Sequence, residues 1–103
     1  MSDKTAVATQ NALPAGWSDV ERSIYERVRH FVADAADVEL DEVTPLVDIF
    51  EELKVDSLGI VLILVNLEDE YDIPQPEDDR EATKNLRTPV DIVEFAMSAA
   101  GLR

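Results

Sequence analysis

The sequence contains no cysteine, one histidine and only three glycines among its 103 residues. Without cysteine, neither a disulfide framework nor thiolate metal ligation is available, and the chain has no thiol nucleophile of its own. The glycines, at positions 16, 59 and 101, lie too far apart to form a phosphate loop of the P-loop or dinucleotide type. These absences exclude several classes of nucleotide-binding and redox protein.

Basic residues are also scarce, with nine lysines and arginines against 23 acids and a net charge of −14. Nucleic acid is bound through lysine and arginine, so this balance argues against a nucleic acid partner. The partners of such a chain are expected to be basic proteins.

Long apolar runs and export signals are absent as well. The start, Met1-Ser2-Asp3-Lys4, lacks a basic region followed by an apolar core, and the longest apolar run is the six residues Ile60–Val65. We therefore expect a cytoplasmic protein with no membrane span.

The composition, 46% hydrophobic and 31% charged, is typical of one small folded domain. Residues 1–16 are small and polar, carry Pro14 and Gly16, and show no periodicity. This pattern predicts a flexible N-terminal tail, followed by a domain over residues 17–103.

A first helix is predicted from a capping box at Ser18 and Glu21 to about Ala36. Its apolar face is expected to comprise Val20, Ile24, Val28, Phe31, Val32 and Ala35. Scattered apolar residues over 37–55 favour a long loop pinned to the core, with a short helical turn at Ile49–Leu53.

A second helix is predicted from Ser57 to about Tyr71. The run Ile60–Val65 alone would also fit a buried strand. We favour a helix because Asp56 is a good N-cap, Pro74 marks the end, and the span is too long for a typical strand.

Beyond an acidic loop at 74–81, a short minor helix is predicted at Ala82–Leu86. Thr88 is expected to cap the last helix, with Pro89 at its first position and Gly101 at its end. Its buried face is predicted to hold Val90, Val93, Met97 and Ala100, within a core that includes Val28, Phe31, Val61, Leu64, Leu67 and Val93. The fold class is therefore all-α: three main helices and a minor one, with a long loop between the first two main helices.

Ser57 is the residue where chemistry is expected. If Asp56 caps the helix, Ser57 takes the first helical position and its hydroxyl faces water. The unpaired N–H groups and the positive end of the helix dipole favour an anion on or beside this serine. The position suits a phosphodiester better than a nucleophile.

The negative charge is concentrated around this serine. Residues 37–81 hold 16 of the 23 acids but only Lys54 and Arg80 as bases. An acidic face can serve solubility alone. Its coincidence with Ser57 favours a docking surface that steers basic partners to the serine.

The sequence offers no catalytic or metal-binding set. A nucleophilic serine needs a base, and the only histidine, His30, falls on the side of the first helix opposite Val28 and Phe31. The acids over 72–81 lack the glycine and the ligand alternation of an EF-hand, which favours solvated carboxylates over a calcium site.

These residues resemble the acyl carrier protein family. Asp56-Ser57-Leu58 is similar to the family's D-S-L attachment motif, and the continuation from Val61 to Leu67-Glu68-Asp69-Glu70-Tyr71 is similar to its second helix. The motif stands at a predicted helix start, about twenty residues beyond the first helix, and the resemblance covers residues 18–101.

The resemblance implies that Ser57 is esterified by 4′-phosphopantetheine, which a phosphopantetheinyl transferase takes from coenzyme A. This arm would supply the missing thiol and hold acyl groups as thioesters for partner enzymes, so the chain itself would not be an enzyme. Asp56 would cap the helix and help the transferase dock, and Leu58 would pack against the helix or a partner. The expected partner-binding residues are Asp56, Leu58, Leu62, Glu68 and Asp69, on a monomer served by an acyl-loading ligase or synthase and other basic-surfaced enzymes.

Several positions depart from the family pattern. Lys54 stands where the family commonly has glycine, and Gly59 and Leu62 stand where members serving fatty acid synthesis often carry acids. The segment between Tyr71 and Leu86 is also longer than expected. These departures favour a discrete carrier of a specialised fatty acid, lipid or polyketide pathway.

Two questions stay open at this point. The Ile60–Val65 run must go round its helix, so Leu62 or Ile63 either packs under the 37–55 loop or forms an apolar partner patch. The cargo is also open, because a carrier for an amino or aryl acid loaded by an adenylating ligase, or an unmodified acidic protein-binding domain, would share many of these features.

Overall fold

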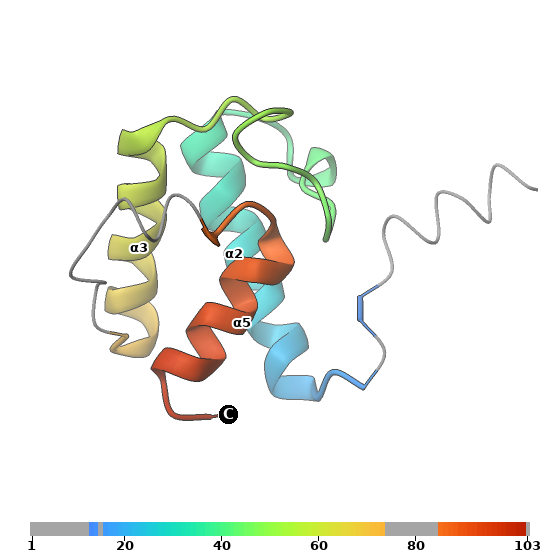
Figure 1. Cartoon of the computed structure of the whole chain (residues 1–103), viewed down its shortest axis with the longest axis vertical. Coiled ribbons are helices and arrows are strands. Elements are labelled where there is room, and N and C mark those ends of the chain that lie inside the picture. The colour runs from blue at the N-terminus through green and yellow to red at the C-terminus, as the bar shows by residue number, and fades with distance from the viewer. Residues whose placement is uncertain (1–12, 15, 74–84, 103) are drawn as a thin grey trace, which may run out of the picture.

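The structure, a computed structural model, describes residues 13, 14, 16–73 and 85–102 (Figure 1). The described residues form three α-helices, α2 (Asp19–Ala36), α3 (Ser57–Tyr71) and α5 (Pro89–Ala99), and one short 3₁₀ helix, η1 (Leu40–Glu42). Helix α2 packs against both α3 and α5, and η1 contacts α2. The predicted all-α bundle with three main helices and a long first connection is confirmed.

Helix α2 begins at the predicted capping box. The Ser18 hydroxyl accepts from the Glu21 N–H at 3.3 Å, and the Ser18 N–H donates to the Glu21 carboxylate at 2.9 Å. The prediction that Val20 belongs to the buried face is wrong, because Val20 is 50% exposed. Trp17 and Tyr25 close that end of the core instead, with ring centres 6.2 Å apart.

Helix α3 buries one stripe of its apolar run. The buried residues follow the helical spacing of one face: Gly59, Ile60, Ile63, Leu64 and Leu67. Val61 was predicted to be a core residue but is only half-buried. It follows Ile60 by one residue, and the helical rotation turns its side chain away from the centre of the buried face. Ile63 is fully buried, whereas Leu62 remains 48% exposed.

Helix α5 carries the predicted signals at both ends. The Thr88 hydroxyl accepts from the Asp91 N–H at 3.1 Å, and Pro89 is the first helical residue. Gly101 has φ of 75° at the C-terminus, where a left-handed residue closes the helix. The buried face is turned from the predicted one, since Val90 and Ala100 are half-buried and the buried residues are Pro89, Ile92, Val93, Ala96 and Met97.

The loop between α2 and α3 is pinned to the core by buried apolar residues, as predicted: Val43, Val47, Ile49, Leu53 and Val55. Where a helical turn was predicted at Ile49–Leu53, the chain forms a hydrogen-bonded turn that starts at Asp48, whose carbonyl accepts from the Glu52 N–H at 2.9 Å. The η1 helix was not predicted. The predicted tail, acidic loop and minor helix fall largely or wholly on residues 1–12, 15 and 74–84, outside the described part of the chain.

Candidate functional site

The α3 N-terminus has the predicted cap geometry. Asp56 has an extended backbone, and its Oδ1 accepts from the Gly59 N–H at 2.8 Å. The first intrahelical hydrogen bond is made by the Ile60 N–H to the Asp56 carbonyl at 3.0 Å. Ser57 is the first helical residue and is exposed. The N–H groups of Ser57 and Leu58 precede that first bond, so they remain available to an anion at the helix end.

Gly59 is a close-packing position. A Cβ placed on Gly59 would lie 2.8 Å from Val55 Cγ1 and 3.7 Å from the Ala35 Cβ of α2. Val55 is itself buried, so its side chain has little room to move away. Packing therefore explains why position 59 holds glycine and not an acidic residue: the start of α3 lies directly against Val55.

Lys54 occupies the left-handed region, with φ of 61°, just before this contact. Such a backbone favours glycine, because a Cβ crowds the neighbouring carbonyl oxygen. The residue lies between the Asp48 turn and the cap residue Asp56. A lysine at this point therefore replaces the residue that the backbone conformation favours.

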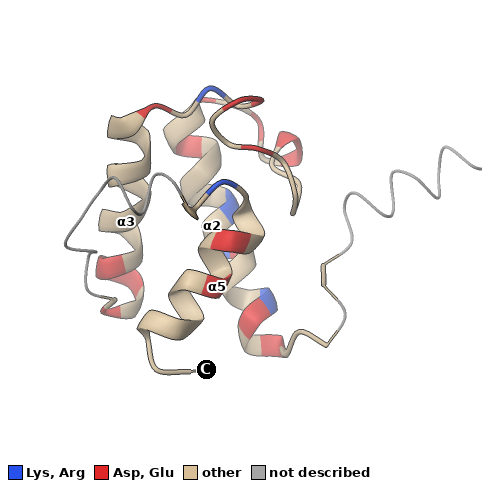
Figure 2. Ribbon diagram, viewed as in Figure 1, with Lys and Arg blue, Asp and Glu red and all other residues tan. Residues whose placement is uncertain are grey.

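The N-terminal part of α3 carries no charged residue and is tan in Figure 2, whereas red acidic residues lie towards its C-terminal end. No charged residue occurs from 57 to 67, and Leu58 and Leu62, one helical turn apart, are 66% and 48% exposed. They form an apolar strip that begins beside the serine. The two alternatives for the Ile60–Val65 run therefore apply to different residues. Ile63 is buried in the core, whereas Leu62 is a surface residue open to a partner.

The structure does not bring Glu68 and Asp69 to the serine. They follow Ser57 by 11 and 12 residues, which corresponds to about 16 Å or more along a helix. Together with Asp72 and Ile73 they line a separate surface hollow at the C-terminal end of α3. The acids nearest to Ser57 in the chain are instead Asp56 and the exposed pair Glu51 and Glu52.

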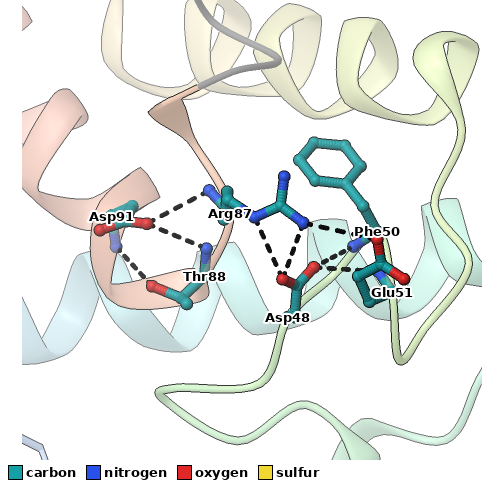
Figure 3. Close-up of polar contacts among 6 residues, drawn as sticks. All are labelled: Asp48, Phe50, Glu51, Arg87, Thr88 and Asp91. Atoms are coloured by element: carbon teal, nitrogen blue, oxygen red, sulfur yellow. Dashed lines mark hydrogen bonds and ion pairs between the residues drawn. The ribbon is translucent and has the colours of Figure 1, made fainter.

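Sequence analysis missed the residues that hold the loop in place. Asp48 accepts hydrogen bonds from the N–H groups of Phe50 and Glu51 and from the Arg87 guanidinium (Figure 3). The pKa of the Asp48 carboxyl lies below its usual value, first because of the hydrogen bond from the Glu51 N–H. Desolvation is the next largest influence and opposes this shift, while the Arg87 side chain and the Phe50 N–H add to the lowering. Nearer the start of the loop, Arg29 of α2 donates to the carbonyls of Leu40 at 3.1 Å and Val43 at 3.3 Å.

A family model described as the phosphopantetheine attachment site matches residues 26–95 of the chain. The chain belongs to this phosphopantetheine-attachment family. The match runs from the middle of α2 into α5 and so covers the helix start that bears Ser57. The protein is therefore a carrier that bears covalently attached 4′-phosphopantetheine. Domains of this family are generally carriers rather than catalysts.

The described residues fit such a group. An attached phosphodiester requires an exposed hydroxyl and an environment that accepts negative charge. Ser57 is exposed, the first turn of α3 contains no acid, and the helix N-terminus is positive. The helices of the described residues include none long and apolar enough to cross a membrane.

Proposed function

We propose that Ser57 is the residue that carries 4′-phosphopantetheine. The observation that carries this proposal is the placement of an exposed serine at the first position of a capped helix whose first turn lacks acids. A phosphodiester on Ser57 would meet the N–H groups of Ser57 and Leu58 and the positive end of the helix. When bound, the group supplies the thiol on which a carrier holds its cargo as a thioester.

The neighbours of Ser57 have separate roles in this proposal. Asp56 fixes the helix start through the Gly59 N–H, and its exposure leaves it open to a basic transferase surface. Leu58 and Leu62 offer apolar contact to enzymes that approach the serine. Glu68 and Asp69 act at the far end of α3, where they steer basic partners over a longer range.

For the cargo, we propose an acyl chain of a specialised fatty acid, lipid or polyketide pathway, carried by a cytoplasmic monomer whose carrier domain spans residues 17–103. The apolar strip supports the specialised pathway, because contact through Leu58 and Leu62 selects partners by shape more narrowly than diffuse charge does. An amino or aryl acid loaded by an adenylating ligase is the second candidate, since an uncharged α3 surface would serve that partner class as well.

The test of the attachment site is the intact mass of the protein after incubation with coenzyme A, magnesium and a broad-specificity phosphopantetheinyl transferase. Wild type is expected to gain one phosphopantetheine, and Ser57→Ala none. Ser98→Ala is the matched control, because Ser98 is also an exposed helical serine and its loss should leave the modification unchanged. No gain by wild type with several transferases would support an unmodified binding domain.

The cargo is tested on the modified protein. Adenylating ligases specific for fatty acids and for amino or aryl acids are each offered their substrates and ATP, and thioester formation is followed by mass. Loading by the fatty acid ligases alone would support an acyl carrier. Loading by the second group alone would establish the other candidate.

A further inference from the structure

A polar cluster joins the loop before α3 to the start of α5 (Figure 3). Asp48 Oδ2 accepts from Arg87 Nε at 3.1 Å and Arg87 Nη2 at 2.9 Å. Asp48 Oδ1 accepts from the N–H groups of Phe50 at 3.0 Å and Glu51 at 2.9 Å. The guanidinium also lies 5.4 Å from the centre of the Phe50 ring and 3.9 Å from a Glu51 carboxylate oxygen. Residues 48–53 form a turn that we call the acidic turn. Arg87 contacts three side chains of this turn, those of Asp48, Phe50 and Glu51.

The arginine is itself held by the α5 cap. The N–H groups of Arg87 and Thr88 both donate to Asp91 Oδ2 at 3.2 Å, and the Thr88 hydroxyl accepts in return from the Asp91 N–H. A capping box of this kind satisfies the free backbone N–H groups at the helix start and so ties the residues just before the helix to its first turn. Arg87 therefore extends from a rigid base.

Backbone hydrogen bonds connect Arg87 to the residues just before Ser57. The Arg87 carbonyl accepts from the Ile49 N–H at 2.9 Å, and the Ile49 carbonyl accepts from the Val55 N–H at 2.8 Å. Ile49 is fully buried, so it is held on all sides. Val55 directly precedes the cap residue Asp56. The position of Arg87 is thus linked by two successive hydrogen bonds to the start of α3.

The side-chain pair contributes little to holding the fold together. The Arg87 and Asp48 side chains are 45% and 27% exposed, and ion pairs of this exposure add little to stability. The bundle is held by the apolar contacts of α2 with α3 and α5. The pair is better suited to fixing the direction of the turn, since two guanidinium N–H groups converge on Asp48 Oδ2 while Oδ1 accepts from the Phe50 and Glu51 N–H groups.

We propose that Arg87 is a positioning residue for the modification of Ser57, acting through Asp48 on the acidic turn. This rests on the proposed attachment at Ser57. The turn presents Glu51 and Glu52, both exposed, to the basic enzyme that approaches the serine. A turn held in one orientation costs that enzyme less ordering on binding. Arg87 therefore lowers the KM of the transferase for the carrier and leaves kcat unchanged.

The test measures transferase initial rates against carrier concentration, with coenzyme A saturating. Arg87→Met keeps the side-chain stem but loses the guanidinium, and KM is expected to rise about fivefold with kcat unchanged. Arg87→Lys should rescue part of the loss. Asp48→Asn, which keeps an oxygen for the Phe50 and Glu51 N–H groups, should match Arg87→Met. Arg22→Met, which removes a charge from an exposed position on α2, is the control.

A second measurement needs no transferase and follows directly the attachment of the acidic turn to Arg87, which we call the clamp. Amide hydrogen exchange at Val55 should be faster in Arg87→Met than in wild type, while exchange at Ile63 in the core of α3 should be unchanged. This result separates the two proposals, because the clamp can be present even if wild type is never modified.

Two results would overturn the positioning role. One is a KM for Arg87→Met equal to that of Arg22→Met. The other is a joint fall of kcat and melting temperature, which would make Arg87 a residue of general stability. Failure of wild type to be modified would instead overturn the assignment of Ser57, and the exchange at Val55 would then report on the clamp alone.

Discussion

Val55 Cγ1 lies 2.8 Å from the position that a Cβ would take on Gly59. The contact joins the end of the long loop to the first turn of α3, and both residues are buried. Ser57 stands between them in the chain. The local geometry of the candidate attachment site is therefore set by a side chain and a glycine on either side of the serine.

Gly59→Ala is expected to destabilise the protein by about 1 kcal/mol, because overpacking of about 1–3 kcal/mol exceeds a gain in helix propensity of at most about 1 kcal/mol. Urea unfolding measures the change. Combining it with Val55→Ala removes the clashing methyl group, so the double variant should lose less stability than the sum of the single ones. If the destabilisations of the two single variants simply add in the double variant, Val55 and Gly59 are not in close contact.

Lys54→Gly is expected to stabilise the protein by about 1 kcal/mol or less, because glycine adopts the φ of 61° without strain but loses more entropy on folding. Lys54→Ala is the matched control, since it removes the same charge and keeps the Cβ. Thermal unfolding should rank glycine above alanine at this position. The reverse order would show that the left-handed backbone carries no strain.

The caps were predictable because each depends on neighbouring residues. Ser18 with Glu21, Asp56 before Ser57, and Thr88 before Pro89 all gave local signals that the structure confirms. The buried stripe of α3 was harder to predict, because a run that is apolar on every side has no periodicity to show which face is inside. Val61 was misplaced for that reason.

The Arg87–Asp48 pair gave no sequence signal, because its partners are 39 residues apart and each looks like an ordinary surface charge. The one local hint was Asp48 itself, since a short acidic side chain readily accepts from backbone N–H groups two and three residues later. The contact between Val55 and Gly59 was missed for a different reason: it depends on where the long loop returns to the helix.

Tyr25 gives a prediction at high pH. Burial raises the pKa of Tyr25 from 10.0 to about 12, partly opposed by Arg29, while Glu26 adds a smaller increase. The folded state thus holds the phenol proton more tightly than the unfolded state. Stability from the neutral phenol is complete below pH 10 and is lost as the pH rises towards 12.

Ultraviolet titration of tyrosinate measures this in a Tyr71→Phe variant, which leaves Tyr25 as the only tyrosine. A Tyr25→Phe variant reports Tyr71, whose pKa is also raised by burial. Titration of Tyr25 at the ordinary value, with the fold intact, would show that its ring is not enclosed as described.

Salt is expected to stabilise the protein. Residues 37–81 hold 16 acids and two bases, and their mutual repulsion weakens the fold most at low ionic strength. The melting temperature should rise with sodium chloride and rise further with magnesium chloride at equal ionic strength. A melting temperature that does not change with either salt would contradict a destabilising repulsion among these acids.

Fragmentation mass spectrometry of the modified wild-type protein would locate the phosphopantetheine group on the chain. Fragments are expected to gain the added mass between Asp56 and Leu58, on Ser57 alone. Modification at any other serine, or a protein that gains no group from any transferase, would contradict attachment at Ser57.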